Sequence, residues 1–134
     1  MPEQDILIVD DEAAVRDTLA AILRDNGYTV DLAATAAEGR KLLGKHRYGV
    51  VLADWRLPDG DGSQIANLAS EAGSYAFVMS GYMAHMLPGS IDLRHALMKP
   101  IRTAELLAAV RACIGTASSA SRYSAFCSGM GLRG

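Results

Sequence analysis

The residue best placed for chemistry is Asp54, which follows the apolar run 50–53 and precedes a turn-rich stretch with Pro58, Gly60 and Gly62. This pattern predicts a buried strand that ends at Asp54 and opens into a loop. In open α/β sheets, ligands bind outside the carboxyl ends of the strands. Asp54 is therefore expected at the ligand-binding edge of a sheet.

Other polar residues directly follow short apolar runs, and they are also expected at the ends of strands: Asp10, Asp11, Ser80 and Lys99. If the first and third strands are neighbours, Asp10 and Asp11 approach Asp54. Two unit charges about 4 Å apart repel by roughly 4 kcal/mol at an effective dielectric near 20. A cation is therefore expected among the three carboxylates.

The ligand types indicate which cation and which chemistry to expect. Oxygen ligands without a nearby Cys or His favour Mg²⁺, which binds carboxylates together with phosphate. The ammonium of Lys99 and the hydroxyl of Ser80 are suited to hold phosphoryl oxygens, and Gly81 leaves room for a phosphoryl donor. The Lys99-Pro100 bond is left open between cis and trans. These residues predict magnesium-dependent phosphoryl chemistry at Asp54.

The hydrophobic pattern predicts a sheet that brings these residues together. Apolar runs predict five strands, near 6–9, 28–33, 50–54, 75–79 and 96–99. Helical spacing predicts helices that end before Gly27, cover 36–45, begin near 62, and run from near 103 to 114. The alternation predicts an α/β fold with a flavodoxin-like, doubly wound, five-stranded parallel sheet in the order 2-1-3-4-5, with helices on both faces.

Local signals predict where two helices begin and where another is disturbed. Thr35 and Glu38 have the spacing of a capping box, and the last helix is expected to be capped near Thr103. Pro88 and Gly89 interrupt the segment after the fourth strand. The fourth helix is therefore expected to be short or irregular.

The composition of the 134 residues suits one folded domain, expected over residues 1–115. Residues 116–134 are rich in Ser, Gly and Ala and are predicted to form a flexible tail. With 13 basic and 15 acidic residues, the chain lacks the basic surface that direct nucleic-acid binding requires. No apolar run approaches the roughly 18 residues of a membrane span, and no signal peptide is visible, so a cytoplasmic protein is expected.

These motifs occur together in one protein family. The chain resembles the receiver domain of two-component response regulators over about residues 6–114. The resemblance rests on Asp10-Asp11, Asp54 with Leu57-Pro58 and Gly62, Ser80-Gly81, and Lys99-Pro100. It implies that Asp54 accepts a phosphoryl group from the phosphohistidine of a sensor histidine kinase or a histidine phosphotransfer protein. It also implies that the chain is not an enzyme beyond its own phosphorylation and dephosphorylation.

The resemblance also implies how the metal is held. By the family pattern, Mg²⁺ would be bound by Asp11, Asp54 and the backbone carbonyl of Arg56, with Asp10 acting through water. Trp55 flanks the acceptor and is expected to report metal or phosphoryl binding through its fluorescence.

The switch is expected to act through strands four and five. Lys99 would pair with the phosphoryl oxygens and Ser80 would turn toward them, because phosphorylation adds about −1.5 to −2 charges. The chain carries Ala96 where the family usually has an aromatic switch residue. Tyr82 and His95 are the candidates to replace that residue on the switch surface.

Two other functions stay open from the sequence. A pseudo-receiver would bind partners through the same fold without being phosphorylated. A Mg²⁺-dependent phosphohydrolase would need a second Asp two residues after its Asp nucleophile, where this chain has Arg56. The sequence does not identify the downstream protein partner, and it is compatible with a homodimer.

Overall fold

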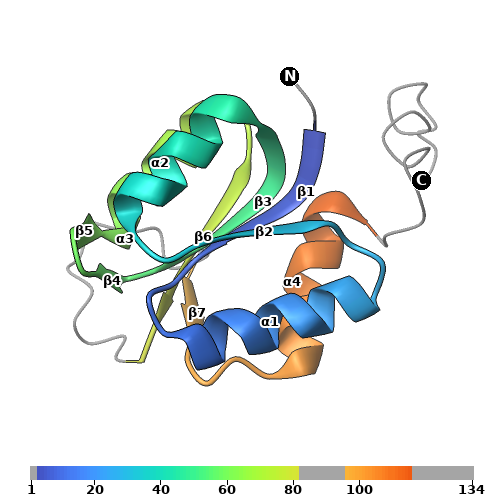
Figure 1. The fold of residues 1–134 in the computed structure, drawn as a ribbon. Helices are drawn as coiled ribbons and strands as arrows, with labels where there is room; N and C mark the ends of the chain where they lie inside the picture. Colours follow the sequence, from blue (N-terminus) through green and yellow to red (C-terminus); the bar gives the residue numbers. More distant parts are fainter. Residues whose placement is uncertain (1–2, 82–95, 116–134) are drawn as a thin grey trace.

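The structure, a computed structural model, describes residues 3–81 and 96–115 and contains a parallel sheet between two layers of helices (Figure 1). The strands of the sheet are β1 (Glu3–Val9), β2 (Val30–Ala33), β3 (Arg47–Asp54), β6 (Tyr75–Ser80) and β7 (Ala96–Met98). They lie in the order β2-β1-β3-β6-β7, and neighbours are parallel. The predicted flavodoxin-like order 2-1-3-4-5 is confirmed. The predictions of an irregular fourth helix and of a flexible tail fall on 82–95 and 116–134, outside the described residues.

The helices cover both faces of the sheet, as predicted. They are α1 (Ala13–Asp25), α2 (Ala36–Lys45), α3 (Gly62–Glu71) and α4 (Thr103–Ile114). Side chains of α1 and α4 belong to the hydrophobic cluster on one face, and side chains of α2 and α3 belong to the cluster on the other.

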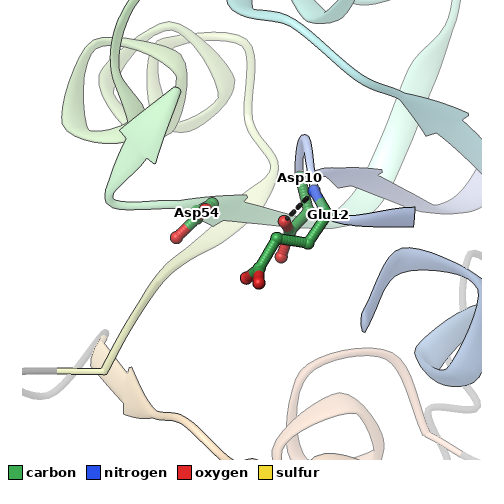
Figure 2. A group of neighbouring side chains, drawn as sticks. All are labelled: Asp10, Glu12 and Asp54. Carbon is green, nitrogen blue, oxygen red and sulfur yellow. Dashed lines mark hydrogen bonds between the residues drawn. The ribbon is translucent and has the colours of Figure 1, made fainter. Parts of the chain in front are cut away.

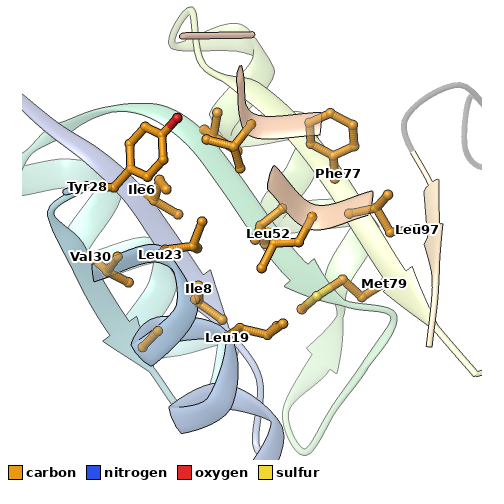
Figure 3. Packing of buried hydrophobic residues seen from close by; sticks show 14 residues of the cluster. Ile6, Ile8, Leu19, Leu23, Tyr28, Val30, Leu52, Phe77, Met79 and Leu97 are labelled. Carbon is orange, nitrogen blue, oxygen red and sulfur yellow. The ribbon is translucent and has the colours of Figure 1, made fainter. Parts of the chain in front are cut away.

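Strand β1 shows how the two clusters form. Ile6 and Ile8 pack with Leu23 of α1 in the first cluster (Figure 3), whereas Leu7 and Val9 belong to the second. Side chains alternate across a strand, so a strand between two helical layers needs apolar residues at every position. All four residues are fully buried, which fits the continuous apolar run in the sequence.

The second strand begins later than predicted, and the second helix begins with a side-chain cap, as predicted. Strand β2 begins at Val30, later than the predicted start at residue 28. Tyr28 instead donates its hydroxyl hydrogen to the carbonyl oxygen of Gly115, at 2.6 Å. The first half of the predicted capping box is present, because the Glu38 N–H donates to Thr35 Oγ1 at 3.1 Å, whereas the Glu38 carboxylate accepts from the N–H of Ala34, one residue before the N-cap, at 2.7 Å.

The last helix begins near Thr103, as predicted, but Thr103 is not itself the N-cap. Thr103 is the first helical residue of α4, and the N-cap is Arg102. The carbonyl oxygen of Arg102 already accepts the first helical hydrogen bond, from the N–H of Leu106. Thr103 therefore lies inside the helix, where its side chain does not occupy the capping position.

A small hairpin follows Asp54 where the sequence predicted only a loop. Its strands are β4 (Arg56–Leu57) and β5 (Gly60–Asp61). At its tip, the Asp59 carboxylate accepts hydrogen bonds from the N–H groups of Ala36 and Ala37, at 2.8 and 3.0 Å. These are N–H groups of the first turn of α2, which have no helical partner. The hairpin is thereby tied to the start of α2.

We predict that Asp59→Ala lowers the melting temperature at neutral pH, because two N–H groups at the start of α2 lose their acceptor. The hydrogen bonds from Ala36 and Ala37 hold the pKa of Asp59 below its ordinary value. The stabilisation is therefore present above the ordinary Asp pKa and is lost as the pH falls through the lowered pKa. Thermal unfolding followed by circular dichroism between neutral pH and pH about 3 measures both effects.

Asp59→Asn is the matched control, since it keeps one acceptor oxygen and removes the charge. It is expected to lie between the wild type and Asp59→Ala at neutral pH. Equal melting temperatures for the wild type and Asp59→Ala at neutral pH would contradict the role of this contact.

Candidate functional site

Asp54 is the last residue of β3, and its neighbours in the sheet place it between two other strand ends. β3 pairs with β1 on one side and with β6 on the other, where Asp54 lies opposite Met79. Asp10 follows β1 directly and is fully buried, while Asp54 is 8% exposed. The predicted meeting of Asp10 and Asp54 at one edge of the sheet is therefore present.

The carboxylates at this edge form a group of three. One oxygen from each of Asp10, Glu12 and Asp54 lies within 4.8 Å of the others, and Figure 2 shows their arrangement at the ends of β1 and β3. The N–H of Glu12 also donates to Asp10 Oδ1 at 2.9 Å. Among the described residues, Asp11 is not part of this group, although it lines a cavity together with Glu12 and Asp54.

The ammonium of Lys99 lies among these carboxylates. Its Nζ is 2.9 Å from Asp10 Oδ2, 3.2 Å from Glu12 Oε1 and 3.3 Å from Asp54 Oδ1. The backbone N–H of Lys99 donates to the carbonyl oxygen of Ser80 at 2.7 Å, which fixes the residue beside the end of β6. The Lys99-Pro100 bond, which the sequence left open, is cis.

Burial and charge shift the pKa values in this group. Burial and the nearby Asp10 charge raise the pKa of Asp54 to about 6, although Lys99 and the backbone N–H of Arg56 act in the opposite direction. Burial alone would lower the pKa of Lys99, but the hydrogen bond and charge of Asp10, together with Asp54 and Glu12, outweigh it and raise that pKa. Asp54 is therefore mostly ionised and Lys99 is protonated at neutral pH.

The site opens into a cavity of about 380 Å³. Its lining contains Glu12 together with most of the residues that the sequence singled out: Asp11, Asp54, Trp55, Arg56, Ser80, Gly81 and Lys99. Ser80 is buried at the end of β6, and Gly81 is exposed beyond it. Pro100 is exposed and lines a second cavity beside α1.

The predicted switch surface is only partly described. Ala96 is the first residue of β7, is half-buried and pairs with Val78 of β6. Tyr82 and His95 lie outside the described residues. Sequence reasoning missed Glu12, whose signal was its place directly after the Asp10-Asp11 pair at the start of a helix.

The carboxylate group can accept a divalent cation. All of its potential ligands are oxygens, the type that Mg²⁺ and Ca²⁺ prefer. A cation would also offset the repulsion among three charges, which Lys99 alone balances only in part. The donor set therefore fits the predicted Mg²⁺.

Residues 6–111 match the family model for the response regulator receiver domain. This chain belongs to the response regulator receiver domain family. The receiver is 31% identical over 111 residues to the transcriptional regulatory protein DltR of Streptococcus agalactiae serotype III (strain NEM316), a match that covers 79% of this chain and 50% of DltR. The chain thus spans about half the length of the curated relatives that it matches.

Solved structures show the same fold. A CheY-like receiver domain protein from Methanospirillum hungatei JF-1 is 32% identical, with a TM-score of 0.72 and coverage of 82% of this chain and 92% of that chain. The beryllofluoride-activated NtrC4 receiver domain dimer is 27% identical, with a TM-score of 0.69 and coverage of 81% and 94%. In the described part of the receiver, no helix has the length and apolar character to cross a membrane.

We predict that Asp54→Asn stabilises the Mg²⁺-free receiver at pH 7.5 by roughly 1–3 kcal/mol, because the pKa of Asp54 rises from 3.8 in the unfolded chain to about 6 in the folded one. With a raised carboxyl pKa, stability falls as the pH increases through this interval. The gain is therefore expected to vanish near pH 4. Urea unfolding at several pH values measures it.

The control for this experiment is Asp17→Asn, because the side chain of Asp17 is 68% exposed on α1. It should change stability little across the same pH range. An Asp54→Asn variant that is less stable than the wild type at pH 7.5 would contradict the prediction.

Gly62 lies against the backbone of Asp54 at the start of α3. Its N–H donates to the carbonyl oxygen of Trp55 at 2.9 Å. A Cβ atom at Gly62 would collide with the carbonyl oxygen of Asp54, which is a backbone atom and moves only with β3. Asp54 and α3 are therefore held together by a contact that only glycine permits.

We predict that Gly62→Ala destabilises the receiver by roughly 1–3 kcal/mol, since β3 or α3 has to shift to admit the methyl group. Gly60→Ala, two residues earlier in the hairpin, is the matched control, because a Cβ there meets its nearest atom at 3.7 Å. Chemical denaturation of both variants measures the difference. Equal effects of the two substitutions would show that the backbone contact is unimportant.

Proposed function

We propose that this receiver accepts a phosphoryl group on Asp54 from the phosphohistidine of a sensor histidine kinase or a histidine phosphotransfer protein. The observation that carries the proposal is the buried Asp54 carboxylate at the sheet edge, 3.3 Å from the Lys99 ammonium and open to a cavity. A carboxylate oxygen of Asp54 attacks phosphorus, the bond from phosphorus to the histidine nitrogen breaks, and an acyl phosphate forms.

Mg²⁺ is the proposed cofactor. The carboxylates of Asp10 and Asp54 support this assignment by their proximity, and Asp11 and the Arg56 carbonyl are the further ligands that the resemblance implies. A bound Mg²⁺ neutralises charge on the phosphoryl oxygens.

The proposed switch uses Lys99 and Ser80. The modification adds about −1.5 to −2 charges next to an ammonium that already faces the acceptor. Lys99 then pairs with the phosphoryl oxygens, and the hydroxyl of Ser80 turns toward them. Ala96 carries no ring, so the output surface has to change through other groups on β6 and β7.

The receiver acts as a phosphorylated signalling module and is not otherwise an enzyme. A homodimer is one form that it takes, by analogy with the receiver dimer of NtrC4. Its downstream protein partner is not identified, direct nucleic-acid binding is not expected, and a cytoplasmic location stays a prediction.

We predict that acetyl phosphate with Mg²⁺ adds one phosphoryl group to the full chain, detected by intact mass. Beryllofluoride with Mg²⁺ is expected to change the fluorescence of Trp55, which lines the cavity. Asp54→Asn abolishes the adduct because the attacking oxygen is lost. Lys99→Ala slows its formation by roughly 100-fold, the scale for removing one charged donor from a transition state.

Lys41→Ala is the matched control, because Lys41 is exposed on α2. It should react like the wild type. A wild type that takes up no phosphoryl group would indicate a pseudo-receiver, and an unchanged adduct in Asp54→Asn would place the acceptor elsewhere. Turnover of a phosphate ester would instead indicate a phosphohydrolase.

A further inference from the structure

Glu12 reaches Lys99 from the start of α1. It occupies the N-cap position, yet its side chain makes no capping hydrogen bond to α1 in the described part of the chain. Its carboxylate lies instead beside the strand ends, with Oε1 3.2 Å from Lys99 Nζ (the carboxylate is drawn in Figure 2). The conformation of Glu12 is thus explained by Lys99 and not by helix capping.

The ammonium of Lys99 is fully engaged in this arrangement. It has three N–H donors, and the carboxylates of Asp10, Glu12 and Asp54 face it at 2.9, 3.2 and 3.3 Å. A phosphoryl group on Asp54 brings further oxygens to the same ammonium. At least one of the present contacts then has to give way.

Burial decides which contact is released. The side chain of Asp10 is 0% exposed, whereas that of Glu12 is 61% exposed. A buried carboxylate that loses its counter-ion is strongly destabilised. An exposed carboxylate returns to water with little loss. Asp10 therefore keeps Lys99, and Glu12 releases it.

We propose that Glu12 is a positioning residue that holds Lys99 in the unphosphorylated receiver and competes with the phosphoryl group for the ammonium. This inference rests on the proposed function of Asp54. Glu12 also lines the cavity that an anionic phosphoryl donor enters. Both effects oppose phosphorylation, so loss of the Glu12 contact favours the phosphorylated state.

A different role for Glu12 gives the opposite result. Its carboxylate belongs to the acidic group that fits a divalent cation. If Glu12 binds Mg²⁺, its removal weakens Mg²⁺ binding and slows phosphorylation. If Glu12 competes for Lys99, its removal speeds phosphorylation. The sign of the effect separates the two roles.

The test compares the full wild-type chain with Glu12→Gln, Glu12→Asp and the control Asp17→Asn. Glu12→Asp keeps the charge but is one methylene shorter, so it separates contact with Lys99 from the general field of an acid. Phosphorylation by acetyl phosphate at fixed Mg²⁺ is followed by intact mass, and Mg²⁺ affinity by Trp55 fluorescence. Both Glu12 variants are expected to react faster than the wild type by roughly two- to five-fold, the range for losing one exposed ion pair.

A second readout does not depend on phosphorylation. In Mg²⁺-free protein, the nitrogen-15 NMR signal of the Lys99 ammonium is expected to shift in Glu12→Gln and Glu12→Asp, and not in Asp17→Asn. Glu12→Asp is further expected to bind Mg²⁺ like the wild type. The difference in phosphorylation rate between the Glu12 variants and the wild type should shrink at high salt, because exposed charges are screened.

The outcomes separate this inference from the function on which it rests. If the wild type takes up no phosphoryl group, both proposals fall. If the wild type reacts and both Glu12 variants react at the wild-type rate, only the inference about Glu12 falls. Slower phosphorylation and weaker Mg²⁺ binding in the Glu12 variants would overturn the inference and identify Glu12 as a metal ligand. A faster Glu12→Gln together with a Glu12→Asp that reacts at the wild-type rate would also overturn it, because the negative charge of residue 12 and not its contact with Lys99 would then control the rate.

Discussion

The site depends on one interaction, the contact of the Lys99 ammonium with carboxylates at the ends of two other strands. Asp10 is fully buried and Asp54 nearly so. Their mutual repulsion amounts to roughly 4 kcal/mol at about 4 Å and an effective dielectric near 20. Leaving a buried charge without its partner costs about 3–5 kcal/mol. Lys99 therefore makes an otherwise unfavourable cluster compatible with a folded sheet.

The order of the strands makes that interaction possible. Lys99 and Asp10 are 89 residues apart in the chain, yet Nζ and Oδ2 are 2.9 Å apart because β1, β3, β6 and β7 end at one edge. The sheet is packed on both faces, so these strand ends have little freedom to move apart. Asp59 and Gly62 extend this rigidity to the hairpin beyond Asp54, the first by a contact to α2 and the second by its lack of a side chain.

Much of this could be predicted from the sequence, because the period of apolar residues identifies strands and the residue after each strand then lies at a known edge. Asp54, Asp10 and Lys99 were found in that way. Glu12 was not found, since an acid at a helix start is also expected from the helix dipole. Its contact with Lys99 depends on a side-chain conformation that the spacing of apolar residues does not determine. Strands β4 and β5 are two residues each, too short for any hydrophobic period to indicate them.

The contact of Lys99 with Ser80 bears on how a change at Asp54 travels without an aromatic residue at position 96. The N–H of Lys99 is bonded to the Ser80 carbonyl oxygen at 2.7 Å, and Ser80 pairs in register with Met98. In the proposed switch, a Lys99 side chain drawn toward phosphoryl oxygens would therefore act on the backbone at the ends of both β6 and β7. An aromatic side chain at position 96 could respond to such a change by rotating, whereas the methyl group of Ala96 has no ring to rotate. In the proposed switch, the backbone at the two strand ends would be the physical link between Asp54 and β7.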